Sequence, residues 1–187
     1  MKVQLPPFRP VYPSPPALIT SADEQGRPNV CTIAETFNIS IRQPVIVGIA
    51  IAPPRYTNEL IRRTREFVIN LPTAAILEKV DLCGSCSGRT ADKFALTGLT
   101  PLPATRVRPP MIAECPVNVE CTLLRVESIG DHDLFIGEVV AEHVNEAVLT
   151  PDGKIDVAKL DMLIYSNSQY WSAGRYLNVH GFTRKKQ

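Results

Sequence analysis

The chain has 187 residues, of which 44% are hydrophobic and 21% are charged, so it fits one compact domain over 1–187 rather than a disordered chain. Twenty Lys and Arg side chains against nineteen Asp and Glu leave a formal charge of +1. This balance gives no electrostatic reason to expect binding to nucleic acid or to an anionic membrane surface.

Membrane-spanning and secreted classes are also disfavoured. No segment approaches the ~18 consecutive apolar residues of a membrane span, and the first residues lack the apolar core of a signal peptide. The five cysteines are an odd number without a secretion signal, which indicates reduced thiols rather than a disulfide framework. We therefore expect a cytoplasmic protein.

The predicted elements begin with a proline-rich arm over residues 1–16, since six of the 17 prolines fall within 6–16. Short apolar strands at 17–21 and 29–34 flank a polar, glycine-containing turn and predict a hairpin. The nearly continuous β-branched run at 44–52 is typical of a buried strand.

Helices and strands then alternate. Residues 57–65 have helical composition, with Thr57 as the expected N-cap. A strand is predicted at 66–71, and two short helices are predicted at 73–82 and 90–96.

The last third of the chain begins with a loop over 101–116 that holds five more prolines. Alternating apolar residues at 117–129 and 133–144 predict a second hairpin, paired across Gly130-Asp131. The segment from 156 to 176 is expected to be mixed helix and loop.

Strands dominate this order and are not spaced as βαβ units. The sequence therefore predicts a mainly β fold, an antiparallel barrel with a few short helices at its ends. A tail of helix and loop over 150–187 would follow the barrel.

The segment 53–57, Pro-Pro-Arg-Tyr-Thr, lies where the buried strand passes into a helix. Helix N-termini present free N–H groups and the positive end of the helix dipole, so they attract phosphate. Arg55 adds a bidentate donor, and Thr57 adds a hydroxyl. A capped helix beside a solvated arginine is the alternative interpretation.

A second candidate is the segment 83–94, which contains glycines, hydroxyl side chains and two cations. Gly88 permits close backbone approach, and Ser87, Arg89 and Lys93 supply donors for an anion. The spacing of a nucleotide P-loop is absent. An ordinary Gly/Ser turn would look similar.

The Cys83-x-x-Cys86 spacing suggests zinc or a redox dithiol. Zinc needs about four ligands, and the remaining cysteines and the three histidines are scattered along the chain. No strand–helix pattern of thioredoxin type surrounds the pair. We therefore predict no metal site.

His132 lies between Asp131 and Asp133 at the expected hairpin corner. One interpretation is a polar turn histidine, and the other is a proton donor or cofactor contact at the mouth of the barrel. The sequence signatures of serine hydrolases, zinc proteases and Rossmann dehydrogenases are absent.

Taken in order, these motifs resemble the flavin reductase-like, FMN-binding split-barrel family, in the branch that includes flavoredoxins. The resemblance spans roughly residues 13–145, and its five short motifs are fairly specific in combination. The motifs are Gly26-Arg27-Pro28-Asn29-Val30, Arg55-Tyr56-Thr57 with Ile61, Glu66-Phe67-Val68-Ile69-Asn70, Ser87-Gly88-Arg89 with Asp92-Lys93-Phe94, and Gly130-Asp131-His132 with Gly137-Glu138-Val139.

The resemblance implies a split antiparallel Greek-key β-barrel that forms a homodimer and binds FMN, or alternatively FAD, near the subunit interface. It places His132 near the exposed face of the flavin ring, where a nicotinamide can stack, and so makes it the candidate catalytic residue. The cofactor-binding residues that it implies are Asn29, Val30, Cys31, Thr32, Ile33 and Ala34 along the ring, Arg55, Thr57, Ser87 and Lys93 at the phosphate, and Tyr56, Gly88 and Arg89 beside them. The tail aromatics Tyr165, Tyr170, Trp171 and Tyr176 remain unaligned.

Three functions stay open. The first is an NAD(P)H-dependent flavin reductase, in which hydride passes from nicotinamide to flavin. This reaction needs stacking geometry more than an acid–base pair, so it agrees with the absence of a recognisable catalytic dyad. The second is a flavoredoxin-type electron carrier with tightly bound FMN and a redox partner protein but no direct NAD(P)H turnover. The third is a flavin-binding protein without turnover.

Overall fold

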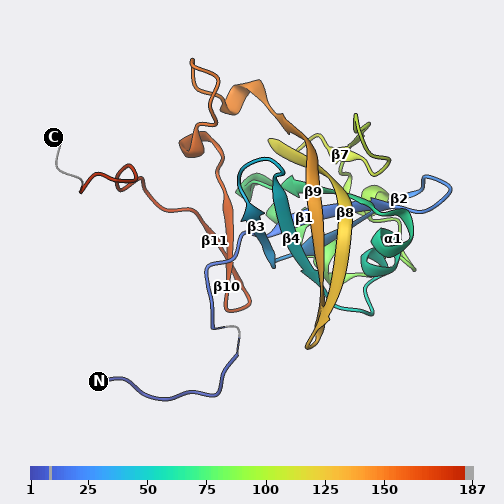
Figure 1. The fold of residues 1–187 in the computed structure, drawn as a ribbon, viewed down its shortest axis with the longest axis horizontal. Coiled ribbons are helices and arrows are strands. Elements are labelled where there is room, and N and C mark those ends of the chain that lie inside the picture. The colour runs from blue at the N-terminus through green and yellow to red at the C-terminus, as the bar shows by residue number, and fades with distance from the viewer. Residues whose placement is uncertain (9, 184–187) are drawn as a thin grey trace.

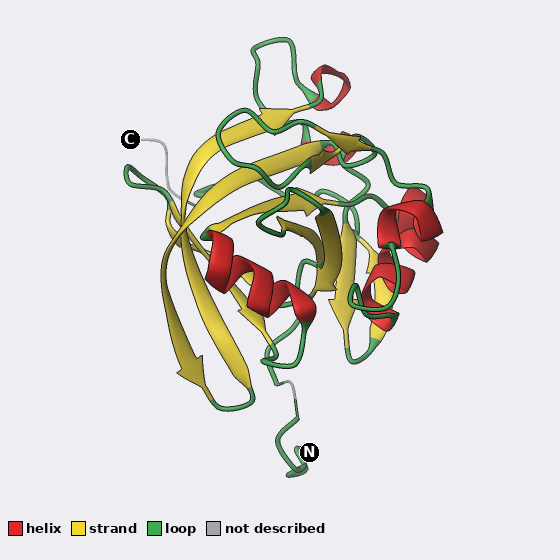
Figure 2. Cartoon of the chain, turned by 90° about the vertical axis from the view of Figure 1, so that its right-hand side faces the viewer, coloured by secondary structure: helices red, strands yellow, loops and turns green. Residues whose placement is uncertain are grey.

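The computed structural model describes residues 1–8 and 10–183. Its centre is a seven-stranded antiparallel sheet with the order β2-β1-β5-β8-β9-β4-β3, which curls into a split barrel (Figures 1 and 2). Its strands are β1 (Ala17–Ala22), β2 (Pro28–Ile33), β3 (Thr36–Ser40), β4 (Ile46–Ile51), β5 (Glu66–Leu71), β8 (Val117–Ile129) and β9 (His132–Val144). The predicted mainly β, antiparallel barrel is confirmed.

Short strand pairs and helices lie outside the main sheet. Two further strand pairs join β6 (Pro101–Leu102) to β7 (Met111–Ile112) and β10 (Leu163–Ser166) to β11 (Gln169–Ser172). The helices are α1 (Tyr56–Thr64), α2 (Leu77–Ser85) and α3 (Lys93–Thr97), with short 3-10 turns at Ala74–Ile76, Glu146–Val148 and Val157–Lys159. In Figure 2, α1 lies across the open side of the curled sheet.

Strand β1 is buried along its whole length because both of its faces are covered. Successive side chains of a strand point to opposite faces. Ile19 therefore packs inside the barrel with Phe67 and Phe135, whereas Leu18 packs outside it with Val80 of α2. The outer core fixes α2 and α3 against β1 and β2, which places the turns around these two helices beside the edge strand β2.

The sequence prediction omits β3, the edge strand that pairs with β4. Phe37 and Ile39 are 47% and 48% exposed, whereas Thr36 is buried. The apolar side chains of this strand thus point away from the barrel core. In a strand with one buried face, the apolar side chains point to the core and the polar ones to solvent. Strand β3 has the opposite arrangement, so its sequence pattern does not identify it.

The prediction of mixed helix and loop for 156–176 was wrong at 163–172, where the β10–β11 hairpin forms, whereas a 3-10 turn and loop occupy the rest of the segment. Asn167 and Ser168 connect the two strands with φ values of 49° and 61°, the left-handed conformation that two-residue hairpin turns require. The backbone of Tyr165 exchanges hydrogen bonds of 2.8 and 2.9 Å with Ser14, so the hairpin is joined to the N-terminal arm.

Helix boundaries also differ from the prediction. Helix α1 begins at Tyr56 with Arg55 as its N-cap, so the assignment of Thr57 as N-cap was wrong. Helix α2 continues to Ser85, beyond its predicted end, and α3 starts only at Lys93. The segment 83–94 is therefore a helix end, a turn and a second helix start.

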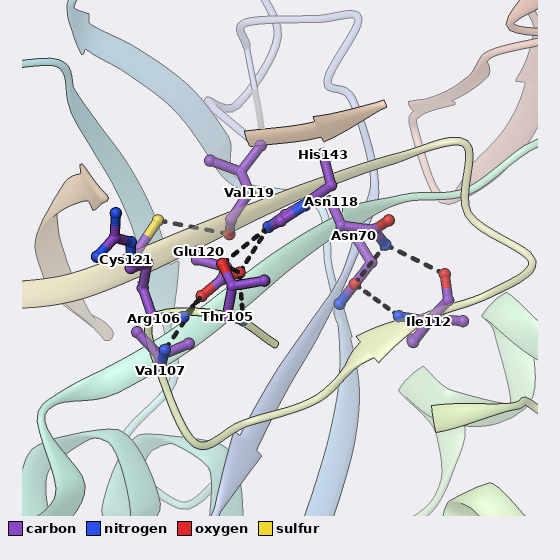
Figure 3. Close-up of polar contacts among 10 residues, drawn as sticks. All are labelled: Asn70, Thr105, Arg106, Val107, Ile112, Asn118, Val119, Glu120, Cys121 and His143. Atoms are coloured by element: carbon purple, nitrogen blue, oxygen red, sulfur yellow. Dashed lines mark hydrogen bonds and ion pairs between the residues drawn. The ribbon is translucent and has the colours of Figure 1, made fainter. Parts of the chain in front are cut away.

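The proline-rich segment 101–116 was predicted as a loop, but it contains the β6–β7 pair. The loop between these two strands is fixed to the barrel by Glu120 of β8 (Figure 3). This fully buried carboxylate accepts hydrogen bonds of 2.6–3.0 Å from the consecutive backbone N–H groups of residues 105–107. It also lies 2.6 Å from Nε2 of His143. Burial alone raises the pKa of Glu120, but the donors around it outweigh burial and lower the pKa to about 2.

Candidate functional site

A cavity of ≈ 380 Å³ lies at the start of α1, and we call it the helix-start cavity. Three segments far apart in the sequence enclose it: strand β2, the start of α1, and the turn that joins α2 to α3. Its lining residues are Asn29, Cys31, Ala52, Pro54, Arg55, Tyr56, Thr57, Cys86, Ser87, Gly88 and Lys93. The sequence predicted eight of these eleven as cofactor contacts.

Thr57 and Asn29 form a buried polar pair in the wall of this cavity. The Nδ2 group of Asn29 donates to the Thr57 hydroxyl at 2.9 Å and to the Ser21 hydroxyl at 3.2 Å. The Thr57 hydroxyl accepts this bond, so its own proton remains available for another acceptor. The first N–H groups of α1 have no intrahelical partner and add further donors. This end of the cavity is therefore suited to an anion.

Lys93, the first residue of α3, adds a positive charge to the lining of the cavity. Its side chain is only 3% exposed, and its Nζ atom donates to the Cys83 carbonyl at 2.6 Å. An ammonium group carries three donors, so two remain for a ligand. Burial raises the pKa of the Cys83 thiol to about 11 despite the opposing charge of Lys93, so the thiol stays neutral beside the ammonium.

A second cavity of ≈ 410 Å³ lies where the chain turns from β2 into β3, and we call it the corner cavity. Ala52 and Arg55 line both cavities, so the two lie side by side. Small side chains such as Ala34 and Ala50 leave room at the barrel edge, where the backbone N–H of Ala50 donates to the Glu35 carbonyl at 3.0 Å. Small apolar side chains at Ala34, Ala50 and Ala52 can face a flat ring here, and the rest of the lining includes the charged residues Glu35, Arg55 and Asp81.

His132 and two tyrosines of the tail close the far side of the corner cavity. The Nδ1 atom of His132 lies 2.9 Å from the Asp131 carboxylate, and one third of its side chain is exposed. The Tyr170 hydroxyl donates to Asp81 at 3.2 Å, and its ring meets Tyr165 edge to face at 5.2 Å. Burial, together with the nearby Asp81 charge, raises the pKa of Tyr170 to about 12.

A buried carboxylate next to His132 joins the hairpin corner to α1. Asp133 accepts hydrogen bonds from Ser128 at 2.6 Å and from Asn58 at 2.8 Å, and it pairs with Arg62 at 2.9 Å. The Ser128, Asn58 and Arg62 donors lower the pKa of Asp133 to about 2. Asn58 is the neighbour of Thr57 in the chain, so this cluster sets the position of both ends of the site relative to each other.

The structure brings most of the predicted residues to these two cavities. In addition to the contacts in the helix-start cavity, Thr32, Ile33, Ala34 and His132 line the corner cavity. Two predicted residues lie elsewhere: Val30 packs in the outer core, and Arg89 lines a neighbouring groove. The sequence reasoning missed Asp81, and it named Tyr165 and Tyr170 without placing them. It noted Asp133 only as an acidic neighbour of His132 and did not predict its contacts with α1.

Among the residues that the structure describes, no helix is long and apolar enough to cross a membrane. No three His, Cys, Asp or Glu side chains among those residues gather as a metal site would require. All five cysteines are free thiols.

The family model of the flavin reductase like domain matches residues 9–174. The chain belongs to the flavin reductase-like family. A flavoredoxin of Desulfovibrio vulgaris (Miyazaki F) has the same fold, with a TM-score of 0.90 and 31% identity over 100% of both chains. Both the family and the split-barrel architecture that the motifs implied are therefore confirmed, and the chain is related to flavin-dependent oxidoreductases.

Two further proteins show the range of similarity. An FMN-binding protein from Thermus thermophilus, solved with bound 1-cyclohex-2-enone, has a TM-score of 0.81 and 28% identity, covering 96% of this chain and 97% of its own. An uncharacterized protein of Archaeoglobus fulgidus is 37% identical over 147 residues, covering 79% of this chain and 80% of its own.

Proposed function

We propose that this protein binds FMN and catalyses NAD(P)H-dependent reduction of the flavin. The observation that carries the proposal is the pair of adjacent cavities, one lined by buried donors and the other by small side chains of the barrel edge with polar groups around them. A phosphate ester and a planar ring at the two ends of one ligand match these two environments. Membership of the flavin reductase-like family gives the chemical class.

Each end of the site has a task in this proposal. Arg55, Thr57, Ser87 and Lys93 bind the phosphate, because their donors converge on the helix-start cavity. Residues 32–34 pack along the flavin ring at the barrel edge. Bound FMN would supply the hydride acceptor for NAD(P)H, the chemistry that no side chain of the site provides. His132 stands at the open side, where it can orient an incoming nicotinamide.

A flavoredoxin-type electron carrier is the second candidate function. The similarity to the Desulfovibrio flavoredoxin over the whole chain favours it. A carrier would hold the same FMN in the same cavities but would exchange electrons with a redox partner protein instead of NAD(P)H.

The decisive measurement is the absorbance of the purified protein before and after rapid mixing with NADH or NADPH. A yellow protein that releases FMN and loses its flavin absorbance quickly on mixing supports the reductase. A yellow protein that responds only to a chemical reductant supports the carrier. A colourless protein that never takes up FMN contradicts both functions.

We also propose that the protein is a homodimer. The arm and the tail leave the barrel on the side of β10 and β11 (Figure 1). Large apolar side chains there are 57–85% exposed, more than a lone surface normally presents. They include Val3, Leu5, Phe8, Val11 and Tyr12 of the arm and Trp171, Tyr176, Leu177, Val179 and Phe182 of the tail. A twofold interface would cover them. Sedimentation that shows a monomer with full flavin occupancy would contradict the dimer.

A further inference from the structure

The Cys83-x-x-Cys86 motif lies at the end of α2, and the proposed function does not use it. Cys83 belongs to the last turn of the helix, and Cys86 is its C-cap. Residues three apart share one face of a helix, and a rise of about 1.5 Å per residue places their Cα atoms roughly 5 Å apart. Disulfides join Cα atoms that are about 4.4–6.8 Å apart. The backbone therefore already has the spacing that a bridge between these two residues needs.

The two thiols differ in their access to solvent. Cys83 is fully buried in the outer core, where burial raises the pKa of its thiol to about 11. Cys86 is half-buried and lines the helix-start cavity. The other three cysteines are all buried. A water-borne oxidant therefore meets Cys86 first, and Cys83 stands one helical turn behind it as a protonated thiol.

The turn that follows Cys86 is coupled to the anion-binding side of the cavity. Ser87 and Gly88 come directly after Cys86, and both line the cavity. A Cβ atom added to Gly88 would overlap the side-chain oxygen of Asn29, so the backbone of the turn packs directly on that side chain. Asn29 in turn donates to the Thr57 hydroxyl at 2.9 Å. A shift of residue 86 therefore moves groups that the proposed function assigns to the phosphate.

A bridge between the two cysteines requires such a shift. Cys83 is held in place by the outer core and by Lys93, whose Nζ atom donates to the Cys83 carbonyl at 2.6 Å. The Sγ atom of Cys86 donates to the Leu82 carbonyl at 3.2 Å, and a disulfide removes this donor. The turn is therefore the part that moves, and it is drawn towards the core and away from the cavity.

We propose that Cys83 and Cys86 form a peroxide-sensitive dithiol whose disulfide lowers the affinity of the helix-start cavity for the flavin phosphate. The inference deepens the proposed function and rests on it. A reduced flavin passes two electrons to dioxygen and gives hydrogen peroxide, so the oxidant arises from the same cofactor. Release of flavin from the oxidised protein limits this side reaction.

The oxidation consists of two steps. The Cys86 sulfur, after loss of its proton, attacks one oxygen of hydrogen peroxide; the O–O bond breaks, the departing hydroxide takes up that proton to form water, and Cys86 becomes a sulfenic acid. The Cys83 sulfur then attacks the Cys86 sulfur, the S–O bond breaks, and the leaving hydroxide takes the Cys83 proton as a second water. The pair loses two electrons in total, and one peroxide becomes two waters. Because Cys83 is one helical turn away, proximity offsets the low acidity of its thiol.

The test follows the thiols and FMN binding in the full-length protein, before and after treatment of the flavin-free form with hydrogen peroxide. Peptide mass spectrometry after thiol alkylation locates any disulfide, and this readout does not depend on flavin. Fluorescence titration gives the FMN dissociation constant of the reduced, the oxidised and the re-reduced protein.

The variants are Cys86→Ser and Cys83→Ala, and each is compared with itself before oxidation. Cys115→Ala is the matched control, because Cys115 is buried in the same outer core as Cys83 but lies outside the motif. Thermal unfolding of each variant confirms that it is folded.

We expect one disulfide, between Cys83 and Cys86, in the oxidised wild type. Oxidation should raise the FMN dissociation constant by about 5- to 50-fold, the range for loss of one or two hydrogen bonds to the phosphate, and a dithiol reductant should reverse the change. By thermodynamic reciprocity, saturating FMN should stabilise the dithiol against a glutathione redox buffer by the same factor.

The variants should separate the roles of the two thiols. Cys83→Ala should stop at a sulfenic acid on Cys86. Cys86→Ser should form no disulfide, and its FMN dissociation constant should not change on treatment with peroxide. Cys115→Ala should respond like the wild type.

Three results would overturn the proposal while leaving the proposed function intact. They are a wild type whose thiols all survive peroxide, a disulfide that joins Cys86 to another cysteine such as Cys31, and a Cys83–Cys86 disulfide that leaves FMN binding unchanged. If the reduced protein binds no FMN, the proposed function fails even where the disulfide forms, and the proposal fails with it.

Discussion

The two ends of the site are built in different ways. The helix-start cavity is formed by side chains that are almost fully buried and bonded to one another, as Asn29, Thr57 and Lys93 illustrate at 6%, 1% and 3% exposure. The corner cavity is closed instead by a half-buried His132 and by tyrosines of a tail hairpin. One end is therefore fixed by buried contacts within the barrel and its helices, whereas the other is completed by a hairpin corner and by a hairpin of the tail. We expect binding energy to concentrate at the first end and control of reactivity at the second.

The largest loss of FMN affinity is expected for Lys93→Ala. This change removes a buried charge and leaves the Cys83 carbonyl without its donor, so FMN binding should weaken by about 3 kcal/mol, the upper end for a charged hydrogen bond. Lys79→Ala is the control, because Lys79 donates to the Gly98 carbonyl at 3.1 Å outside the cavity. Fluorescence titration with FMN measures both. Equal affinity in the wild type and Lys93→Ala would mean that the phosphate lies elsewhere.

Arg55→Ala should have the next largest effect. Arg55 is exposed and holds only the Gly84 carbonyl at 3.4 Å, so most of its donors are available to a ligand. Its loss should weaken FMN binding by about 1.5–3 kcal/mol. The same titration with Arg42→Ala, an exposed arginine away from both cavities, controls for net charge. If the two variants bind FMN alike, Arg55 does not contact the phosphate.

The corner cavity is tested by His132→Ala. We expect reduction of bound flavin by NAD(P)H to slow by about 10- to 100-fold, the range for loss of one positioning or proton-transfer contact. FMN affinity should stay nearly constant, because His132 lies outside the helix-start cavity. Stopped-flow rates at about pH 6 and pH 8 measure the effect, with the exposed His180→Ala as control. Unchanged rates at both pH values would identify His132 as an ordinary turn residue.

Asp133 joins the two ends of the site. Of the four substitutions, Asp133→Asn should have the smallest effect on flavin binding and reduction, and its effect is measured on stability. The folded pKa of Asp133, about 2, lies below the ordinary ~3.9, so its contribution to stability is complete above about pH 4. The contribution is lost as the pH falls from about 4 towards 2. Asp133→Asn should lower the free energy of unfolding at pH 7 by about 1–3 kcal/mol and make its decline below pH 4 less steep.

Urea unfolding between about pH 2 and pH 7 measures this change. Asp152→Asn is the control, since Asp152 is 62% exposed and pairs only with its neighbours Thr150 and Lys154. A parallel shift of both variants at every pH would show that the Asp133 cluster does not couple the hairpin corner to α1.

The sequence predicted those strands whose spacing of apolar residues matches their burial in the fold. The β-branched run at 44–52 and the hairpin 117–144 are both present, because their apolar residues face a core. It failed at β3, where Phe37 and Ile39 point outward, and at the tail hairpin, whose turn lacks glycine. Both segments lie outside the cores, so local patterning carried no signal of their structure.

The sequence predicted which residues form the candidate site, but it did not predict which contacts each of them makes. Spacing placed Arg55, Thr57, Ser87 and Lys93 among the candidates, and the fold brings them to one cavity. The sequence could not show that Arg89 turns towards Glu59, because that contact depends on how the turn lies against α1. Contacts between distant segments are set by tertiary packing, which motif spacing does not encode.

The anchoring of the proline-rich loop by Glu120 has a consequence for hydrogen exchange. Residues 105–107 belong to no helix or strand, yet each of their amide protons is bound by a fully buried carboxylate. Amides of this kind exchange only when the structure that shields them opens. These three should therefore exchange as slowly as the amides of the barrel strands. On an exchange map, this irregular loop would look like part of the barrel.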